Sequence, residues 1–262
     1  MNEIALTIAG SDPSGGAGIQ ADLKTFLDCD VYGMAVITAL TVQNTCGVKA
    51  VTPCEPTLVG SQLDCLLSDC PPAAAKLGMM GSAGILQAVR ASLEQHHRDV
   101  GAFPVVVDPV LSATSGATLL DPDGAQRMLH EVAGFASLIT PNSDEAQALW
   151  SGRSLQAWSD QTGISVLLKG GHAAGDRLTD CLYQPGESPI RWHHDRIASL
   201  NTHGTGCTLS AAITASLARG SNIATATHEA IEYTQGLIQK SQGHRIGQGT
   251  GPLLHGLALK QP

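Results

Sequence analysis

The segment with the clearest chemical potential is residues 201–210, which read NTHGTGCTLS and precede a run of small residues typical of a packed helix. Glycines at 204 and 206 let the backbone approach a ligand closely. The N–H groups of Gly204, Thr205, Gly206 and Cys207 would open this helix without intrahelical partners, so they could hold a phosphoryl group during its transfer. In that first turn we expect the pKa of the Cys207 thiol to be lowered by the helix dipole. The alternative is an ordinary glycine-rich loop before a helix with a buried cysteine.

Two other segments resemble nucleotide-binding motifs, but each lacks a required residue. Residues 18–25 read GIQADLKT and carry Leu23 where the phosphate loop of an NTPase needs glycine. Residues 204–209 lack the third glycine of the dinucleotide-binding motif and lie late in the chain. The sequence therefore supports neither a P-loop NTPase nor a NAD-dependent dehydrogenase.

Charged residues follow two of the apolar segments. Asp108 ends the run PVVVD, where a buried acid needs a partner such as hydrated Mg²⁺ or a group of donors, unless it only forms the turn before proline. Lys169 ends VLLK and could hold a phosphate as a point charge, or it could be a solvated lysine at a strand end. Glu145 follows Asn142 by three residues, a spacing that also fits a helix capping box.

Polar and flexible residues elsewhere could form a small-molecule pocket. Asp22 and Gln43 lie beside apolar runs and could read the edge of a heterocycle by paired hydrogen bonds, although each alone is more often a surface residue. Met79 could line a pocket, but core packing is the commoner role of methionine. We interpret the histidine pairs at 96–97 and 193–194 as solvated.

Apolar strand-like runs alternate with helix-like runs along the chain. We expect strands at residues 4–9, 34–41, 74–78, 104–108, 138–140 and 166–169, helices between them and at 204–218 and 223–240, and a hairpin at 178–183 and 190–194. This order predicts an α/β fold with a mostly parallel sheet covered by helices on both faces, and a single domain over 1–262. Ligands bind such sheets at the carboxyl ends of the strands, where the polar residues above lie.

The composition excludes several classes of protein. The chain has 262 residues, a net charge of −8 and no cluster of lysine and arginine, so we expect no nucleic-acid partner. Its first apolar run, residues 4–9, is too short for a signal peptide or a membrane span. Seven scattered cysteines without a CxxC pair argue against a zinc site and indicate reduced thiols in the cytoplasm.

Taken together, these segments resemble a known family. The runs GSDPSGGAGIQADLKT, VITALTVQNT, KLGM, VVDPV, ITPN, LLKGGH and NTHGTGCTLSAA occur here in the order typical of bacterial hydroxymethylpyrimidine/phosphomethylpyrimidine kinases. That family belongs to the ribokinase-like superfamily, so the resemblance implies its fold, with no separate lid domain. It also implies a cytoplasmic enzyme of thiamine biosynthesis, a homodimer that uses ATP and Mg²⁺. Its reaction would phosphorylate 4-amino-5-hydroxymethyl-2-methylpyrimidine and then the resulting monophosphate.

The resemblance also implies a role for each matching residue. Gln43 would bind the aminopyrimidine with Asp22 beside it, and Gly10 and Met79 would line the ring. Residues 204–206 would form the anion hole, and Cys207 stands where sugar kinases of this superfamily carry an aspartate base. Lys169 and Asn142 would bind the nucleotide, and Asp108 and Glu145 would lie at the metal. Two alternatives remain: a pyridoxal kinase or dual-specificity kinase, and, more remotely, a non-catalytic ligand-binding module.

The sequence departs from this family in one peripheral stretch. Residues 150–163 are fewer than in many relatives, so an outer element could be shortened there. NSDE at residues 142–145 stands where NLPE is common, which keeps Glu145 and adds Asp144 near the predicted metal region. Both changes leave the predicted activity in place.

Overall fold

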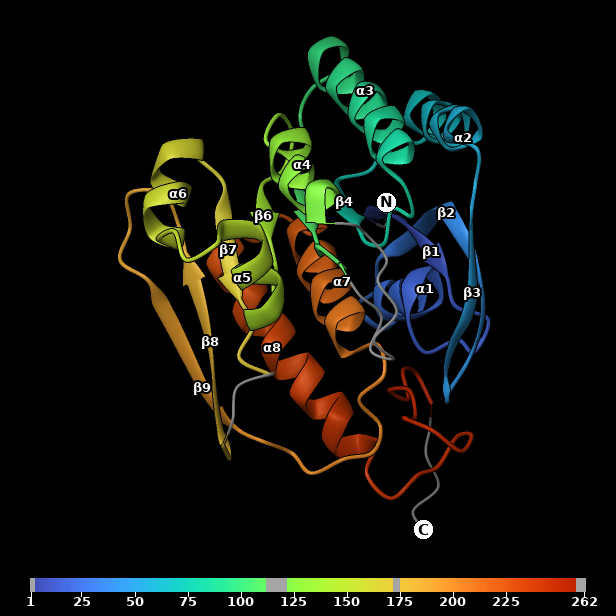
Figure 1. The fold of residues 1–262 in the computed structure, drawn as a ribbon, viewed down its shortest axis with the longest axis vertical. Helices are drawn as coiled ribbons and strands as arrows, with labels where there is room; N and C mark the ends of the chain where they lie inside the picture. The colour runs from blue at the N-terminus through green and yellow to red at the C-terminus, as the bar shows by residue number, and fades with distance from the viewer. Residues whose placement is uncertain (1–2, 112–121, 172–174, 258–262) are drawn as a thin grey trace.

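The computed structural model describes residues 3–111, 122–171 and 175–257, and within them the chain forms one nine-stranded sheet (Figure 1). The strand order is β3-β2-β1-β4-β5-β6-β7-β8-β9. The strands from β2 to β7 in this order run parallel, whereas β3, β8 and β9 pair antiparallel, so the prediction of a mostly parallel sheet is confirmed. Their bounds are β1 (Ile4–Ser11), β2 (Tyr32–Asn44), β3 (Gly47–Pro53), β4 (Ala74–Leu77), β5 (Val105–Val107), β6 (Leu138–Ile139), β7 (Ser165–Leu168), β8 (Arg177–Tyr183) and β9 (Ile190–Asp195).

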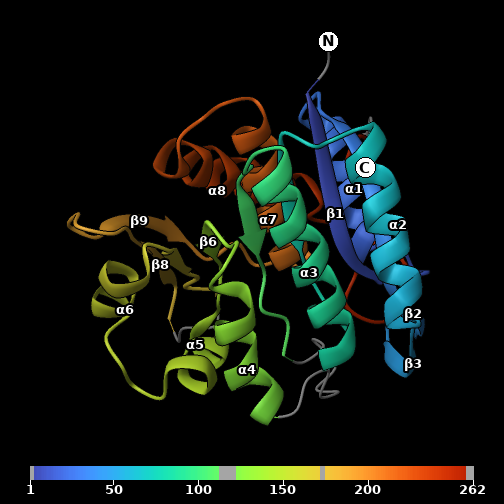
Figure 2. The same cartoon turned by 90° about the horizontal axis from the view of Figure 1, so that it is seen from above.

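Helices cover both faces of the sheet, as predicted. One face carries α1 (Gly18–Asp28), α7 (Thr205–Ala218) and α8 (Ile223–Lys240), and the other carries α2 (Pro56–Asp69), α3 (Ala83–Asp99), α4 (Pro122–Val132), α5 (Ser143–Trp150) and α6 (Leu155–Thr162). In both views α7 lies beside α8, and α2 beside α3 (Figures 1 and 2). None of the helices in the described part of the chain is long and apolar enough to cross a membrane.

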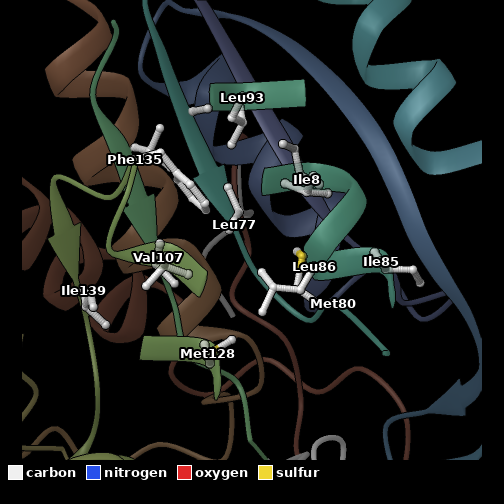
Figure 3. Packing of buried hydrophobic residues seen from close by; sticks show 14 of the residues in the cluster. Ile8, Leu77, Met80, Ile85, Leu86, Leu93, Val107, Met128, Phe135 and Ile139 are labelled. Atoms are coloured by element: carbon white, nitrogen blue, oxygen red, sulfur yellow. The ribbon is translucent and has the colours of Figure 1, made fainter. Parts of the chain in front are cut away.

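Alternating side chains of the central strands fill the two layers between sheet and helices. On β1, Leu6 and Ile8 point into the layer under α2 to α5, whereas Ala5 points into the layer under α1, α7 and α8. Figure 3 shows the first layer, where Ile8 packs among residues such as Leu77 and Val107. After its first turn α7 is buried all round and consists mostly of small residues, which lets it pack closely against the strands beneath its N-terminus.

Two elements were not predicted. The strand β3 pairs with β2 as a hairpin, but its side chains have no buried face, so its sequence lacks the alternation that marks a strand. The short span after Trp150 still forms the helix α6, in which Trp158 packs edge-to-face on Trp150 with ring centres 5.3 Å apart. The shortened stretch thus retains a helix.

The prediction that the histidines at 96–97 and 193–194 are solvated holds for His193 alone. His97 is half-buried, with its ring centre 4.9 Å from that of Phe103. His96 is buried against Phe103, with ring centres 5.6 Å apart. His194 is half-buried, and its Nε2 lies 2.8 Å from Asp180 Oδ2. His96 and His194 lie on the inner side of an amphipathic element, and a polar ring there is tolerated because it keeps a hydrogen bond or an aromatic contact.

Candidate active site

A crevice of about 850 Å³ opens at the carboxyl ends of the parallel strands. It lies where the sheet changes its direction of growth, because β2 pairs with one edge of β1 and β4 with the other. The crevice brings together almost every residue that the sequence singled out: Gly10, Gln43, Met79, Asp108, Asn142, Glu145, Lys169, Gly204, Thr205, Gly206 and Cys207. Its size fits a nucleotide together with a small heterocycle.

The start of α7 forms an anion cradle, made of the backbone of residues 204–207. Gly204 has φ +79°, and a Cβ at this position would collide with the backbone oxygen of Gly16. A Cβ at Gly206 would come within 3.5 Å of Lys169 Nζ and 3.6 Å of Asp108 Oδ2. The first glycine is therefore required by the turn, and the second keeps open the space between the helix end and the charged groups.

A cluster of charges faces this cradle. Lys169 Nζ lies 2.8 Å from Asp108 Oδ1 and 3.9 Å from Glu145 Oε2. Burial would raise the pKa of Asp108, but Lys169, Lys76 and hydrogen bonds outweigh it, so this pKa is lowered. Burial raises the pKa of Glu145 to about 7 because the neighbouring Lys169 compensates only in part. The cluster thus holds an ionised aspartate and an ammonium at the cradle.

Asn142 and Glu145 also form the capping box of α5. Asn142 Oδ1 accepts a hydrogen bond from the Glu145 N–H, and Glu145 Oε2 accepts one from the Asn142 N–H, each at 2.8 Å. The capping interpretation is therefore confirmed. It does not remove either residue from the crevice wall, because one helix end can position both side chains there.

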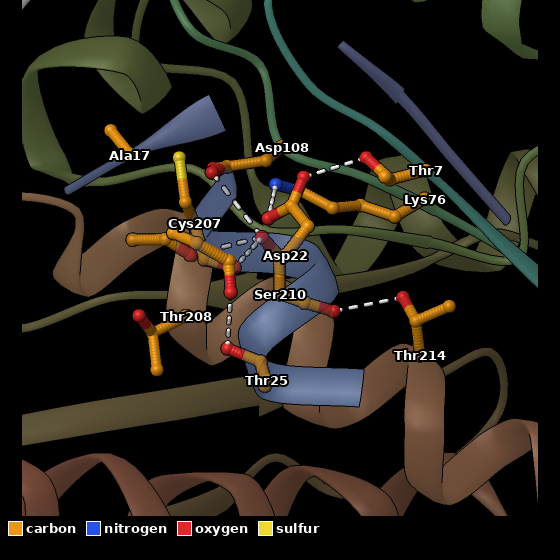
Figure 4. A network of polar contacts seen from close by, with 12 residues as sticks. Thr7, Ala17, Asp22, Thr25, Lys76, Asp108, Cys207, Thr208, Ser210 and Thr214 are labelled. Atoms are coloured by element: carbon orange, nitrogen blue, oxygen red, sulfur yellow. Dashed lines mark hydrogen bonds and ion pairs between the residues drawn. The ribbon is translucent and has the colours of Figure 1, made fainter. Parts of the chain in front are cut away.

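Asp22 is the predicted residue that the structure does not bring to the crevice wall. It is fully buried, and Figure 4 shows its carboxylate between Thr7 and Lys76. Thr7 Oγ1 donates to Asp22 Oδ2 and Lys76 Nζ to Asp22 Oδ1, each at 2.6 Å. Because Asp22 is fully buried and absent from the lining of the crevice, it does not reach a heterocycle bound there. It instead holds Lys76, which does line the crevice.

The prediction of a lowered pKa for the Cys207 thiol is wrong. Burial raises this pKa to about 11. Lys76 and the N–H of Gly18 lower it, but Asp22 and Asp108 raise it further. The positive end of α7 does not make up for this removal from water, so the thiol is protonated at neutral pH.

Sequence analysis missed three residues of the site: Asp12, Lys76 and His203. Asp12 accepts hydrogen bonds from the N–H groups of residues 14, 16 and 17 and lies 2.8 Å from His203 Nε2, which fixes the loop against Gly204. An aspartate followed by Ser and Gly is a signal for such a turn. A lysine inside an apolar strand, as in AAKL, is a signal for a buried partner.

The opposite wall is formed by β1, β2 and the loop after β4. Gly10 lies so close to Met79 that a Cβ would overlap the Met79 methyl group. Gln43 projects beside them, with Nε2 3.3 Å from His203 Nε2. This wall combines the apolar surface at Gly10 and Met79 with a few polar side chains, among them Gln43, which is the composition expected for binding a small polar ring.

Comparison with known proteins gives this geometry a family context. Residues 12–254 match the model of the family described as phosphomethylpyrimidine kinase. The chain is 43% identical to the hydroxymethylpyrimidine/phosphomethylpyrimidine kinase of Rhizobium meliloti, over 97% of each chain. Among solved structures it is similar to the ADP complex of Bacillus subtilis pyridoxal kinase, with a TM-score of 0.84, 32% identity and coverage of 97% and 98%. It is also similar to the phosphomethylpyrimidine kinase of Clostridium difficile, with a TM-score of 0.72, 36% identity and coverage of 90% and 99%.

Proposed function

The chain belongs to the phosphomethylpyrimidine kinase family, and from this premise we propose a kinase of thiamine biosynthesis that phosphorylates a pyrimidine twice. The first transfer would move the γ-phosphoryl group of ATP to the hydroxymethyl oxygen of 4-amino-5-hydroxymethyl-2-methylpyrimidine. The second would move another γ-phosphoryl group to the phosphate of the product. The observation that carries the proposal is one crevice with a ring-sized wall at Gln43 and Met79 and an anion cradle at residues 204–207.

We propose that the cradle and Lys169 hold the γ-phosphoryl group during transfer. Such a group passes through a loose transition state with negative charge spread over its oxygens, so position and charge compensation dominate the rate. The N–H groups of Gly206 and Cys207 at the start of α7 and the Lys169 ammonium would both face that charge, and Asn142 would help to position the nucleotide. The Thr205 N–H donates to the backbone oxygen of Thr202. The alcohol would enter from the Gln43 wall, which sets the line of attack.

Cys207 is proposed to take the proton of the attacking hydroxyl. Its thiol is protonated in the free protein, so it cannot act as a preformed thiolate. In a loose transition state the alcohol keeps its proton until late, and a weak base then suffices. We therefore assign Cys207 first to the positioning of the alcohol by a hydrogen bond and second to a proton relay, in which its sulfur takes the hydroxyl proton while its own S–H proton passes to an oxygen of the phosphoryl group as the new O–P bond forms.

Mg²⁺ is the metal that this reaction would use, and the residues present fit it. Mg²⁺ keeps most of its waters and binds one or two carboxylates plus substrate phosphates. Asp108 and Glu145 both line the crevice beside Lys169 and supply two such oxygen donors. Bound there, the ion would neutralise phosphate charge. No cluster of three or more metal-ligating side chains occurs among the described residues.

Product analysis tests the proposed activity. The protein is incubated with ATP, Mg²⁺ and the hydroxymethylpyrimidine, and in parallel with pyridoxal, because a pyridoxal kinase shares this fold. We expect a pyrimidine monophosphate followed by a diphosphate, with a lower kcat/KM for pyridoxal. Phosphorylation of pyridoxal alone would replace the proposal by the vitamin B6 reaction. Binding of ATP and pyrimidine without any product would indicate a ligand-binding module.

Three further features of the protein are proposed with this activity. Residues 1–262 form one kinase domain, which the single sheet and the match over 12–254 support. The protein is a homodimer, since Leu40 and Val42 are 55% and 58% exposed side by side on β2 and would be covered by a second copy. It is cytoplasmic, as its seven free cysteines suggest. Light scattering after size exclusion tests the dimer, and a monomer at micromolar concentration would contradict it.

A further inference from the structure

A hydrogen-bonded group beside the cradle surrounds the side-chain amide of Gln43. Gln43 Nε2 lies 3.3 Å from His203 Nε2, and Gln43 Oε1 lies 3.2 Å from Thr41 Oγ1. His203 Nε2 also lies 2.8 Å from Asp12 Oδ2. Thr41 Oγ1 donates to the backbone oxygen of Ser11 at 2.9 Å. All five residues line the crevice.

Asp12 determines which way the hydrogen bond of His203 points. The Asp12 carboxylate accepts bonds from three backbone N–H groups and a serine hydroxyl, a set that only an ionised carboxylate satisfies well. Burial opposes ionisation, but these bonds and His203 outweigh it and lower the pKa of Asp12. An ionised carboxylate at 2.8 Å requires a hydrogen on His203 Nε2. That nitrogen is therefore a donor and cannot accept from the amide nitrogen of Gln43.

Thr41 also requires the nitrogen of the Gln43 amide, rather than its oxygen, to face it. Its hydroxyl has one hydrogen, and the contact with the backbone oxygen of Ser11, at 2.9 Å, is shorter than the contact with Gln43, at 3.2 Å, so the hydrogen lies on the Ser11 bond. Thr41 Oγ1 is then left as an acceptor facing Gln43. An amide oxygen in that place would put two acceptors together.

We propose that His203 and Thr41 fix the Gln43 amide with its oxygen toward His203 and its nitrogen toward Thr41, and so select a 4-aminopyrimidine over its 4-oxo analogue. A half-turn about the last torsion of Gln43 exchanges the two atoms at almost unchanged positions. The nitrogen then donates to Thr41 Oγ1, and the oxygen faces the His203 N–H, which it shares with the shorter bond to Asp12. This inference rests on the proposed function, because it concerns the ring that the kinase accepts. It makes His203 and Thr41 positioning residues that act through Gln43.

The selectivity follows from counting the remaining bonds of the amide. After the bonds to His203 and Thr41, Gln43 retains one N–H and one oxygen lone pair. An aminopyrimidine offers the matching pair, an acceptor at ring N3 and a donor at the amino group. The 4-oxo ring in its lactam form offers the inverse pair. A freely rotating amide would match either ring, but a fixed amide matches only one.

The ring cannot turn over to escape this mismatch. Its hydroxymethyl group must point to the cradle at residues 204–207 for transfer to occur, so the edge that faces Gln43 is set by the reaction itself. A site built to hydrogen-bond a ligand rejects an analogue by several orders of magnitude when its polar groups are left unpaired. We therefore expect the wild-type protein to prefer the 4-amino ring by at least about a hundredfold.

The test is the ratio of kcat/KM for the 4-amino and 4-oxo hydroxymethylpyrimidines as acceptors of the phosphoryl group, because the reacting pose fixes the edge of the ring that faces Gln43. Thr41→Val removes the hydroxyl at nearly constant shape and is expected to lower the preference about tenfold, chiefly through a higher kcat/KM for the 4-oxo ring. Thr41→Ser keeps the hydroxyl and His203→Gln keeps an N–H donor, so both variants should keep the preference for the 4-amino ring. His203→Leu removes the donor and should lose that preference. Thr52→Val, on the exposed side of β3, is the matched control.

A merely structural role would lower kcat/KM for both rings equally and leave the ratio unchanged. The inference is overturned if the wild-type ratio is close to one, or if folded Thr41→Val keeps the wild-type ratio. Product formation in the same preparations separates this from the proposed function. If the wild-type protein phosphorylates the 4-amino compound but Thr41→Val keeps the wild-type ratio, the kinase assignment stands and only this inference is wrong. A wild-type protein that neither binds nor phosphorylates either ring overturns both.

Discussion

The ion pair beneath the crevice offers a strong test of how the site is supported. Lys76 lies in the central strand β4 and Asp22 on α1, and both are fully buried. Lys76 Nζ lies 2.6 Å from Asp22 Oδ1. Lys76→Met would leave the Asp22 carboxylate without its cation, and Asp22→Asn would leave the Lys76 ammonium without its nearest anion. Each single change isolates one charge in a region without water.

The expected energies follow from this burial. Removing one partner of a buried pair costs about 3–5 kcal/mol in the free energy of unfolding. Independent effects would therefore add to about 8 kcal/mol in the double variant, enough to unfold many domains of this size. In Asp22→Asn/Lys76→Met no charge is isolated, and the amide oxygen introduced at position 22 still accepts from Thr7. One amide NH₂ group, with two N–H bonds, then remains without a partner, which costs about 1–3 kcal/mol.

Urea unfolding followed by fluorescence and far-UV circular dichroism measures these energies for the wild type, both single variants and the double variant. We expect the double variant to be more stable than either single variant, with an interaction energy of about 3 kcal/mol or more. Thr7→Val is the control, since it leaves the ion pair in place and removes one hydrogen bond to the Asp22 carboxylate, worth about 1.5–3 kcal/mol. Additive destabilisation in the double variant would refute the view that Asp22 serves to compensate Lys76.

Three further outcomes are expected. Cys207→Ala should lower kcat by about 10²–10⁴ while the cradle retains activity above background, and near wild-type turnover would remove its proton role. Burial lowers the pKa of His255 from 6.5 to about 4, so stability should be full above pH 6.5 and fall by about 3 kcal/mol as the pH drops to 4. His255→Gln should flatten that urea-midpoint profile, and parallel profiles would contradict this cause. Gly10→Ala should raise KM for the pyrimidine by displacing Met79, with the KM for ATP as the unaffected control.

Much of the site could be predicted because it depends on the alternation of strands and helices. Once β1, β2, β5 and β7 are recognised as parallel strands, their carboxyl ends must lie at one edge of the sheet. Gly10, Gln43, Asp108 and Lys169 stand at or just beyond these ends, so their meeting in one crevice follows from chain order. The cradle was predictable for a similar reason, because glycines before a helix expose its first N–H groups.

The features that could not be predicted depend on contacts between distant segments. Asp22 on α1 meets Lys76 on β4, and no spacing in the sequence pairs them. The pKa of Cys207 depends on burial by other elements, so the lowered pKa expected from its position at a helix N-terminus was wrong. The strand β3 was not predicted because both of its faces are accessible to solvent, so its sequence lacks the alternation of apolar and polar residues that a strand normally shows.

The choice of ring must reside in side-chain hydrogen bonds, because pyridoxal kinases and phosphomethylpyrimidine kinases share this backbone. The cradle and Lys169 would meet only the phosphoryl group and the alcohol, which a hydroxymethyl pyridine and a hydroxymethyl pyrimidine both offer. The Gly10 and Met79 surface is apolar and would accept either flat ring. Gln43 carries a donor and an acceptor on that wall that would distinguish ring edges, and in the proposed arrangement its orientation depends on His203 and Thr41. His203 directly precedes Gly204, so a residue that would position the ring-binding amide is covalently joined to the turn at which α7 begins.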